Sequence, residues 1–286
     1  MIFRNAMSFK TKIKQLAKEK GITSQQVQQN YLIEVFLVKL AKSKYKDNFI
    51  IKGGYLIGGI VGLDNRATMD LDTTIKGFDL TPEILSKITK EIVETITDES
   101  FTLSFVDVEE IRETDDYPGY RLKLRATFEK ISEIVAIDVT SGDIITPREV
   151  DFSFKQLFDD NKIELLSYPL ETVLAEKIET ILSRGIATTR PRDYYDIFIL
   201  LKTQINMLNV LTIKQALENT MRKRASNFDI LEYNAILNLV ETSSFHIQLW
   251  EKYQHQFSYA DAISFSEVIS SVRELMKNVV ESAESN

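Results

Sequence analysis

The sequence contains no cysteine and only two histidines, which removes several classes of chemistry. Without cysteine there is no disulfide framework, no thiol nucleophile and no cysteine-ligated zinc site, and a reducing cytosol is the compartment that fits. His246 and His255 stand late in the chain among glutamine, tyrosine and phenylalanine. We therefore do not expect a histidine-based metal or general-base site.

Long apolar runs are also missing. No segment approaches the roughly 18 uninterrupted apolar residues that a membrane-spanning helix needs, and the amino terminus runs into charged, helical sequence. We expect a soluble, cytoplasmic protein with no membrane partner. A formal net charge of −7 disfavours non-specific wrapping of duplex DNA. Basic residues nevertheless cluster within residues 10–20, 121–125, 184–192 and 222–224. Each cluster is either a solvated helix face or a local attraction for a phosphate-bearing partner.

Hydrophobic periodicity predicts an α+β fold in two parts. The 286 residues are enough for one large or two modest domains. Helices are expected over residues 9–20, 23–43 and 81–95, and strands over 49–51, 68–75, 101–108, 120–128 and 133–140. Six further helices are expected over residues 169–184, 191–203, 212–224, 229–241, 244–257 and 261–281. This division predicts a mixed sheet with helices in residues 1–165 and an all-helical domain in residues 166–286.

An Asp-x-Asp motif carries the clearest chemical signal. Asp70 and Asp72 fall within the predicted strand, where residues i and i+2 point to one side and present two adjacent carboxylates. Mg²⁺ is the expected cation, since it is commonly bound by one or two carboxylates together with substrate phosphates. The glycine pair Gly53-Gly54 precedes this motif and follows an apolar strand. The pattern predicts nucleotide chemistry.

Asp138 interrupts a nearly continuous apolar run, residues 134–140. Burying a carboxylate there is costly unless it binds a metal or a partner, so Asp138 is the candidate third metal ligand. The alternative is a residue at the end of a strand that pairs with an arginine. The strand over 120–128 places Arg121, Lys123 and Arg125 on one face, which is open to solvent or to a charged partner.

The predicted helical domain contains a lysine on an apolar face. At 100° per residue, Lys177 falls inside the arc of buried residues of its helix, and Asp193 and Asp196 lie on the inward side of the next helix. Lys177 could extend to the edge of the helix, or reach a cleft and contact a triphosphate. An internal salt bridge between Lys177 and one of the two aspartates is an equally good interpretation.

Several elements occur in order along the chain: Lys52-Gly53-Gly54, Arg66-x-Thr68-x-Asp70-x-Asp72, a strand with Asp138, Leu174-Ala175-Glu176-Lys177 and Arg192-Asp193-Tyr194-Tyr195-Asp196. In these elements the chain resembles the AbiEii/AbiGii toxin family of bacterial nucleotidyltransferases, over roughly residues 45–205. The resemblance implies a polymerase-β-like nucleotidyltransferase domain followed by a helical domain. It also implies the toxin of a type IV toxin–antitoxin pair in abortive infection, a phage defence, with a cognate antitoxin as partner.

Relatives use a nucleoside triphosphate with Mg²⁺, and some add nucleotides to the 3′ acceptor end of tRNA, so tRNA is the acceptor that the resemblance implies. Carried over by position, the resemblance assigns roles to the motif residues: nucleotide binding to Gly53, Gly54, Arg66, Thr68 and Lys177, metal binding to Asp70, Asp72 and Asp138, and an essential acid to Asp193 or Asp196. Two other functions stay open: transfer of a nucleotide to a protein hydroxyl, and a nucleotide-binding regulator without turnover.

Overall fold

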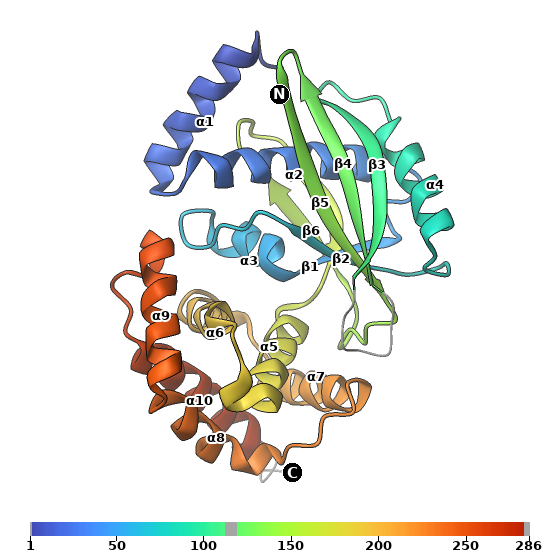
Figure 1. Ribbon diagram of the computed structural model, residues 1–286. Helices are drawn as coiled ribbons and strands as arrows, with labels where there is room; N and C mark the ends of the chain where they lie inside the picture. Colours follow the sequence, from blue (N-terminus) through green and yellow to red (C-terminus); the bar gives the residue numbers. More distant parts are fainter. Residues whose placement is uncertain (1, 112–118, 283–286) are drawn as a thin grey trace. The chain divides into compact units, whose positions relative to one another are not determined.

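A mixed sheet of seven strands organises the first part of the chain (Figure 1). The computed structural model describes residues 2–111 and 119–282, which divide into two units: one up to Asp143 together with Glu149–Ser167, and one of Ile144–Arg148 together with the chain from Tyr168. The strand order is β3-β4-β5-β2-β1-β7-β6. In chain order the strands are β1 Phe49–Lys52, β2 Leu71–Ile75, β3 Thr102–Ile111, β4 Gly119–Phe128, β5 Ile131–Ser141, β6 Val150–Lys155 and β7 Lys162–Ser167.

The pairs β2–β5 and β1–β7 are parallel, and the other neighbours are antiparallel. Figure 1 shows β3, β4 and β5 side by side as long strands, with α4 next to β3. The helices of this unit are α1 Ala6–Lys20, α2 Ser24–Lys42, α3 Gly53–Val61 and α4 Pro82–Val93. Thr23 and Thr81 cap α2 and α4, as their sequence positions predict.

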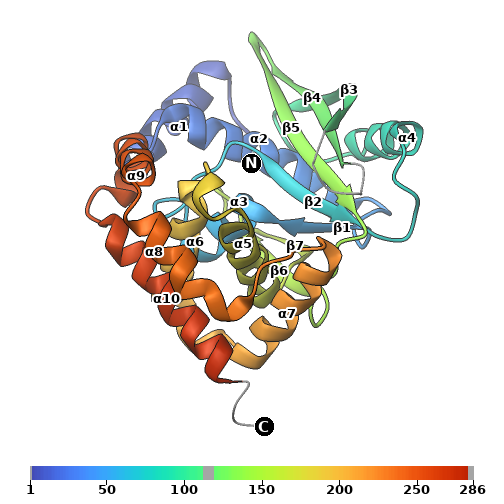
Figure 2. The ribbon, with the colours of Figure 1, turned by 60° about the horizontal axis from the view of Figure 1, so that its bottom comes forward.

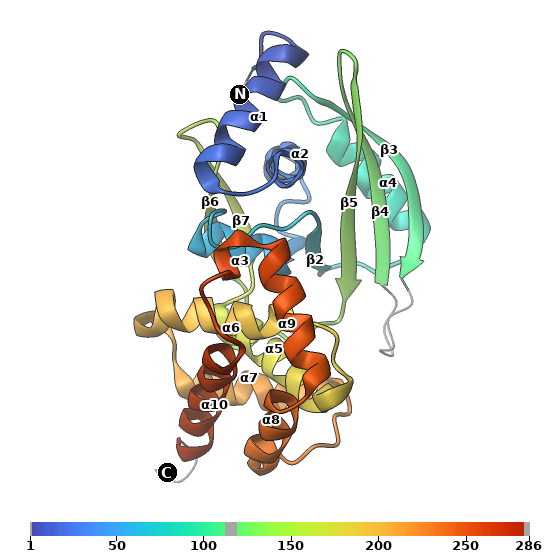
Figure 3. The same cartoon turned by 60° about the vertical axis from the view of Figure 1, so that its left-hand side comes forward.

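Helix α2 forms the centre of the core of this unit. Nearly all its residues from Gln26 to Leu40 are buried, because α2 contacts α1, α4 and strands β5 and β7. Figure 3 shows α2 end-on between α1 and the sheet. Aromatic rings pack in edge-on and tilted contacts at one end of this core: Phe3, Phe9, Tyr31, Phe101 and Phe158.

The second unit is helical. Its helices are α5 Leu170–Arg184, α6 Pro191–Gln204, α7 Val210–Lys223, α8 Tyr233–Glu241, α9 Ser244–Gln256 and α10 Phe265–Glu281. Helix α5 packs against α6 and α7, and α10 packs against α6, α7 and α8 (Figure 2). Within the described residues, no helix is both long and apolar enough to cross a membrane.

The α+β fold class is confirmed, while several local predictions were wrong. Strands β6 and β7 were not predicted, although β6 alternates apolar and polar residues and Asp159, Asp160 and Asn161 give a turn signal between the two strands. Residues 69 and 70 form a bend, so Asp70 precedes β2 instead of lying in it. The last helix begins at Phe265 and not at residue 261, because Ser264 and Glu267 form a capping box there.

Candidate active site

The turn between β1 and α3 brings the two glycines against the Asp-x-Asp motif. Gly53 has φ +65°, and a β-carbon on it would lie 2.1 Å from Oδ2 of Asp72. A β-carbon on Gly54 would lie 3.0 Å from Nη2 of Arg66 and 3.1 Å from Oγ1 of Thr68. Only glycine allows both this left-handed backbone and the close approach of the Asp72 carboxylate. Residues 12 to 19 positions apart in the sequence therefore meet at one turn.

The segment before β2 is held in place by hydrogen bonds to its neighbours. The Thr68 hydroxyl donates to Oδ1 of Asp70 at 2.6 Å, and Nδ2 of Asn30 on α2 donates to the Thr68 carbonyl at 2.6 Å. Arg66 is buried, and its Nη1 donates to the carbonyl of Ala67 at 2.6 Å. These bonds explain why Asp70 lies in a bend, yet still close to the strand that carries Asp72.

Four charged residues form a row across adjacent strands. Asp72 on β2 stands directly opposite Lys52 on β1 and Asp138 on β5, and Asp138 stands opposite Arg121 on β4. Residues paired in this way point to the same face, and neighbouring strands lie about 4.8 Å apart. Two acids therefore stand between two bases on one face of the sheet; Figure 2 shows the strands β5, β2 and β1 next to one another.

Asp138 is paired with an arginine, as the alternative interpretation of its sequence position predicted. Nε and Nη2 of Arg121 donate to Oδ1 and Oδ2 of Asp138, each at 2.7 Å. Hydrogen bonding to Asp138 raises the pKa of Arg121, and the negative charges of Asp138, Asp70 and Asp72 raise it further. All three predicted metal ligands thus lie close enough to influence one guanidinium group.

Lys52 is a site residue that sequence reasoning did not assign. Its Nζ donates to the Thr140 hydroxyl at 2.8 Å and to Oδ2 of Asp143 at 2.7 Å, and its side chain is mostly buried. The signal in the sequence is its place directly before Gly53. Arg121 was also not assigned, because its pairing with Asp138 depends on a strand register that one sequence does not reveal.

The donor set fits a divalent cation held by two carboxylates and by substrate phosphates. Asp70 and Asp72 supply hard oxygen donors, and the first turn of α3 supplies backbone N–H groups next to them, as phosphate-binding helix termini do. Within residues 2–111 and 119–282, no three acidic or histidine side chains converge as a complete metal site. Asp138 does not complete such a site, because both of its carboxylate oxygens accept hydrogen bonds from Arg121.

The other predicted residues form a buried cluster in the helical unit. Nζ of Lys177 on α5 lies 2.9 Å from Oδ1 of Asp193 and 2.7 Å from Oδ2 of Asp196, both on α6. Burial alone would lower the pKa of Lys177, but the two carboxylates outweigh it and raise the pKa. The internal salt bridge offered as an alternative is present and includes both aspartates. Contact of Lys177 with a phosphate stays a prediction.

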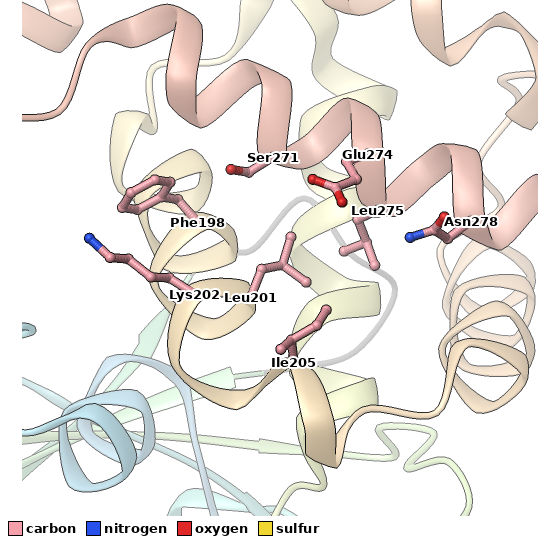
Figure 4. A pocket seen from close by; sticks show the side chains of 8 residues that line it. All are labelled: Phe198, Leu201, Lys202, Ile205, Ser271, Glu274, Leu275 and Asn278. Carbon is pink, nitrogen blue, oxygen red and sulfur yellow. The ribbon is translucent and has the colours of Figure 1, made fainter.

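A small pocket between α6 and α10 contains none of the predicted site residues (Figure 4). Its volume is about 230 Å³, below the range usual for ligand sites. Figure 4 shows apolar side chains at its centre and polar ones at its rim: Phe198, Leu201, Lys202, Ile205, Ser271, Glu274, Leu275 and Asn278. We do not assign the chemistry to this pocket.

Comparison with solved structures identifies the class of fold. The crystal structure of JHP933 from Helicobacter pylori is similar, with a TM-score of 0.53 and 14% identity over 92% of this chain and 97% of that chain. A structure of a candidate nucleotidyltransferase from H. pylori is also similar, with a TM-score of 0.52 and 14% identity over 91% of this chain and 98% of that chain. At this identity the likeness shows the fold alone.

The family is shown by the sequence. The family described as "Nucleotidyl transferase AbiEii toxin, Type IV TA system" matches residues 35–273. The chain therefore belongs to the AbiEii family of nucleotidyltransferase toxins of type IV toxin–antitoxin systems. A search of the curated proteins gave no match.

Proposed function

We propose that this toxin is a Mg²⁺-dependent enzyme that transfers a nucleoside monophosphate from a nucleoside triphosphate to an acceptor hydroxyl. The acceptor that we favour is the 3′ end of tRNA, and growth inhibition in phage defence would follow from its modification. The observation that carries the proposal is the close approach of the Asp72 carboxylate to Gly53, together with the hydrogen bond that Thr68, packed against Gly54, donates to Asp70.

The residues of the first unit can perform the steps of this reaction. Asp70 and Asp72 would hold the cation, which when bound neutralises the triphosphate and lowers the pKa of the attacking hydroxyl. Backbone N–H groups at the start of α3 would hold the phosphates, with Arg66 and Thr68 supporting the turn. The acceptor oxygen forms a bond to the α-phosphorus, the bond to the β-phosphate oxygen breaks, and pyrophosphate leaves. Asp138 would accept the proton of the hydroxyl.

Roles in the second unit rest on the family resemblance. We propose phosphate contact for Lys177 and an essential role for Asp193 or Asp196, since these residues match the family motifs. The two units would correspond to a nucleotidyltransferase domain, residues 1–165, and a helical domain, residues 166–286. A cognate antitoxin is the protein partner that membership of a type IV toxin–antitoxin family supports.

The direct test is to incubate the full-length protein with each α-labelled nucleoside triphosphate, Mg²⁺ and total bacterial RNA. We expect label in the tRNA fraction, release of pyrophosphate, and loss of both with Asp72→Asn. The matched control is Asp79→Asn, which removes an exposed carboxylate from the loop before α4. Transfer by Asp72→Asn at the rate of Asp79→Asn would overturn the proposal.

The same experiment distinguishes the other two functions. Label in protein fractions, bound to serine, threonine or tyrosine, would identify nucleotidylation of a protein target. Nucleotide binding without pyrophosphate release would identify a regulator without turnover. The presence of both Asp70 and Asp72 favours catalysis, because a protein that only binds a nucleotide does not need two carboxylates to activate a hydroxyl.

A further inference from the structure

The pair between Arg121 and Asp138 has a geometry that conflicts with metal binding by Asp138. Both carboxylate oxygens accept hydrogen bonds from the guanidinium, at 2.7 Å each. A carboxylate held in this way has its lone pairs directed at the arginine, and a positive charge beside it repels a divalent ion. While the pair persists, the acidic site therefore consists of Asp70 and Asp72.

The same arginine is positioned to respond to an anion. Its side chain is 41% exposed, whereas that of Asp138 is 17% exposed, so the guanidinium has room to turn away and leave the carboxylate free to reorient towards Asp72. Its two parallel hydrogen bonds make this pair stronger than an ordinary surface ion pair, so Asp138 is displaced only by another anion that the guanidinium can bind in the same way. Asp72 and Asp138 are register neighbours, so a triphosphate bound at Asp72 would bring its negative charge beside Arg121. The planar guanidinium binds phosphate oxygens as well as it binds a carboxylate.

We propose that Arg121 is a latch that holds Asp138 out of the metal site until an anionic substrate group releases it. In the protein without substrate, Arg121 is hydrogen-bonded to both carboxylate oxygens of Asp138. When the triphosphate binds, Arg121 pairs with a phosphate, and Asp138 becomes available as the third carboxylate. Substrate binding and completion of the metal site are then coupled, and the two must strengthen each other reciprocally. The inference rests on the proposed function, because it takes the bound anion to be a nucleoside triphosphate.

The first test measures Mn²⁺ binding by the full-length protein without nucleotide, by electron paramagnetic resonance. The variants are Arg121→Gln and, as matched control, Lys123→Gln. Lys123 lies two residues further along the same face of β4 and is paired with Glu109, so its loss removes the same charge without freeing Asp138. We expect Arg121→Gln to bind Mn²⁺ about tenfold more tightly than the wild type, and Lys123→Gln to change the affinity by about twofold or less.

A double variant shows whether the increase in Mn²⁺ affinity depends on Asp138. Adding Asp138→Asn to Arg121→Gln should return the affinity to the wild-type value, because the gain comes from the freed carboxylate. Equal Mn²⁺ affinities of Arg121→Gln and Lys123→Gln, or a gain that survives Asp138→Asn, would overturn the latch. Arg121→Lys gives a further check, because it keeps the charge but not the two parallel hydrogen bonds, and an intermediate affinity is expected.

The second test measures binding of α,β-methylene nucleoside triphosphates in the presence of EDTA. We expect Arg121→Gln to weaken binding about tenfold relative to Lys123→Gln, as loss of a charged phosphate contact does. Equal binding by the two variants would overturn the proposed release by the substrate. If the wild type binds no triphosphate even when Mg²⁺ replaces the EDTA, the proposed function fails, whereas the Mn²⁺ titration still reports on the pairing of Arg121 with Asp138. Thermal unfolding of each variant shows that it is folded.

Discussion

Gly53→Ala tests the contact on which the proposed active site depends. The φ of +65° costs a non-glycine residue about 1–2 kcal/mol. The new β-carbon would also lie 2.1 Å from Oδ2, 2.8 Å from Cγ and 2.9 Å from Cβ of Asp72. To restore ordinary contact distances, the carboxylate or the turn must move by about 1 Å.

A displacement of this size at a reacting centre lowers the rate by about 100-fold. We therefore expect Gly53→Ala to reduce kcat/KM for nucleotidyl transfer by about two orders of magnitude, while the free energy of unfolding falls by only about 1–2 kcal/mol. Transfer of label from the triphosphate measures the first quantity, and urea unfolding followed by circular dichroism measures the second.

Gly77→Ala is the matched control. Gly77 has φ +90°, and the nearest atom to a β-carbon there is Nδ2 of Asn48 at 3.0 Å, the end of a flexible side chain. This variant should lose a similar amount of stability and keep the transfer activity of the folded protein. If Gly53→Ala is no less active than Gly77→Ala, the Asp72 carboxylate does not act at the glycine turn and our reasoning is refuted.

Three further predictions concern hydrogen bonding, the buried ion cluster and pH. Thr68→Val removes the 2.6 Å hydrogen bond to Asp70 and should weaken Mn²⁺ binding about tenfold. A Mn²⁺ affinity equal to that of the wild type would show that other contacts orient Asp70. Lys177→Met leaves the carboxylates of Asp193 and Asp196 buried without their cation. The free energy of unfolding measured in urea should therefore fall by about 3 kcal/mol. A fall of less than about 0.5 kcal/mol would show that this cluster does not stabilise the packing of α5 against α6. Burial raises the pKa of Glu34 to about 8, against the effect of its bond to the Leu157 N–H and with a further rise from Glu99. The folded state then keeps a proton that the unfolded state loses above pH 4.5, so the free energy of unfolding should fall by about 1.4 kcal/mol per pH unit as the pH rises towards 8. Glu34→Gln should abolish this slope, and a variant that retains it would assign the slope to another group.

Short motifs in the sequence predict the chemistry, and the structure brings the glycine pair of these motifs against Asp72. The spacing of Asp70 and Asp72 and the glycine pair before them indicated a cation and a triphosphate, because few other patterns need these residue types together. The apolar arc around Lys177 placed this lysine on the inward face of its helix, and the salt bridge to the inward aspartates of the next helix was one of the alternatives. These inferences depend on helical or strand periodicity, which is a local property of the chain.

Contacts that depend on strand register could not be predicted. Asp138 pairs with Arg121 because β4 and β5 align these two residues, and a shift by one position would turn Arg121 to the other face. Lys52 likewise reaches Asp143 only because β1 and β5 belong to one sheet. The bend at Asp70 depends on the bond from Asn30 of α2 to Thr68, 38 residues away. Each of these features comes from tertiary structure.

The central claim is that Asp70 and Asp72 together hold a divalent cation beside the Gly53 turn. The most direct measurement is a Mn²⁺ titration of the full-length protein and of the double variant Asp70→Asn/Asp72→Asn, with Asp79→Asn as control. The double variant should lose the Mn²⁺ signal while the control keeps it, with both proteins folded. Undiminished Mn²⁺ binding by the double variant would contradict the account.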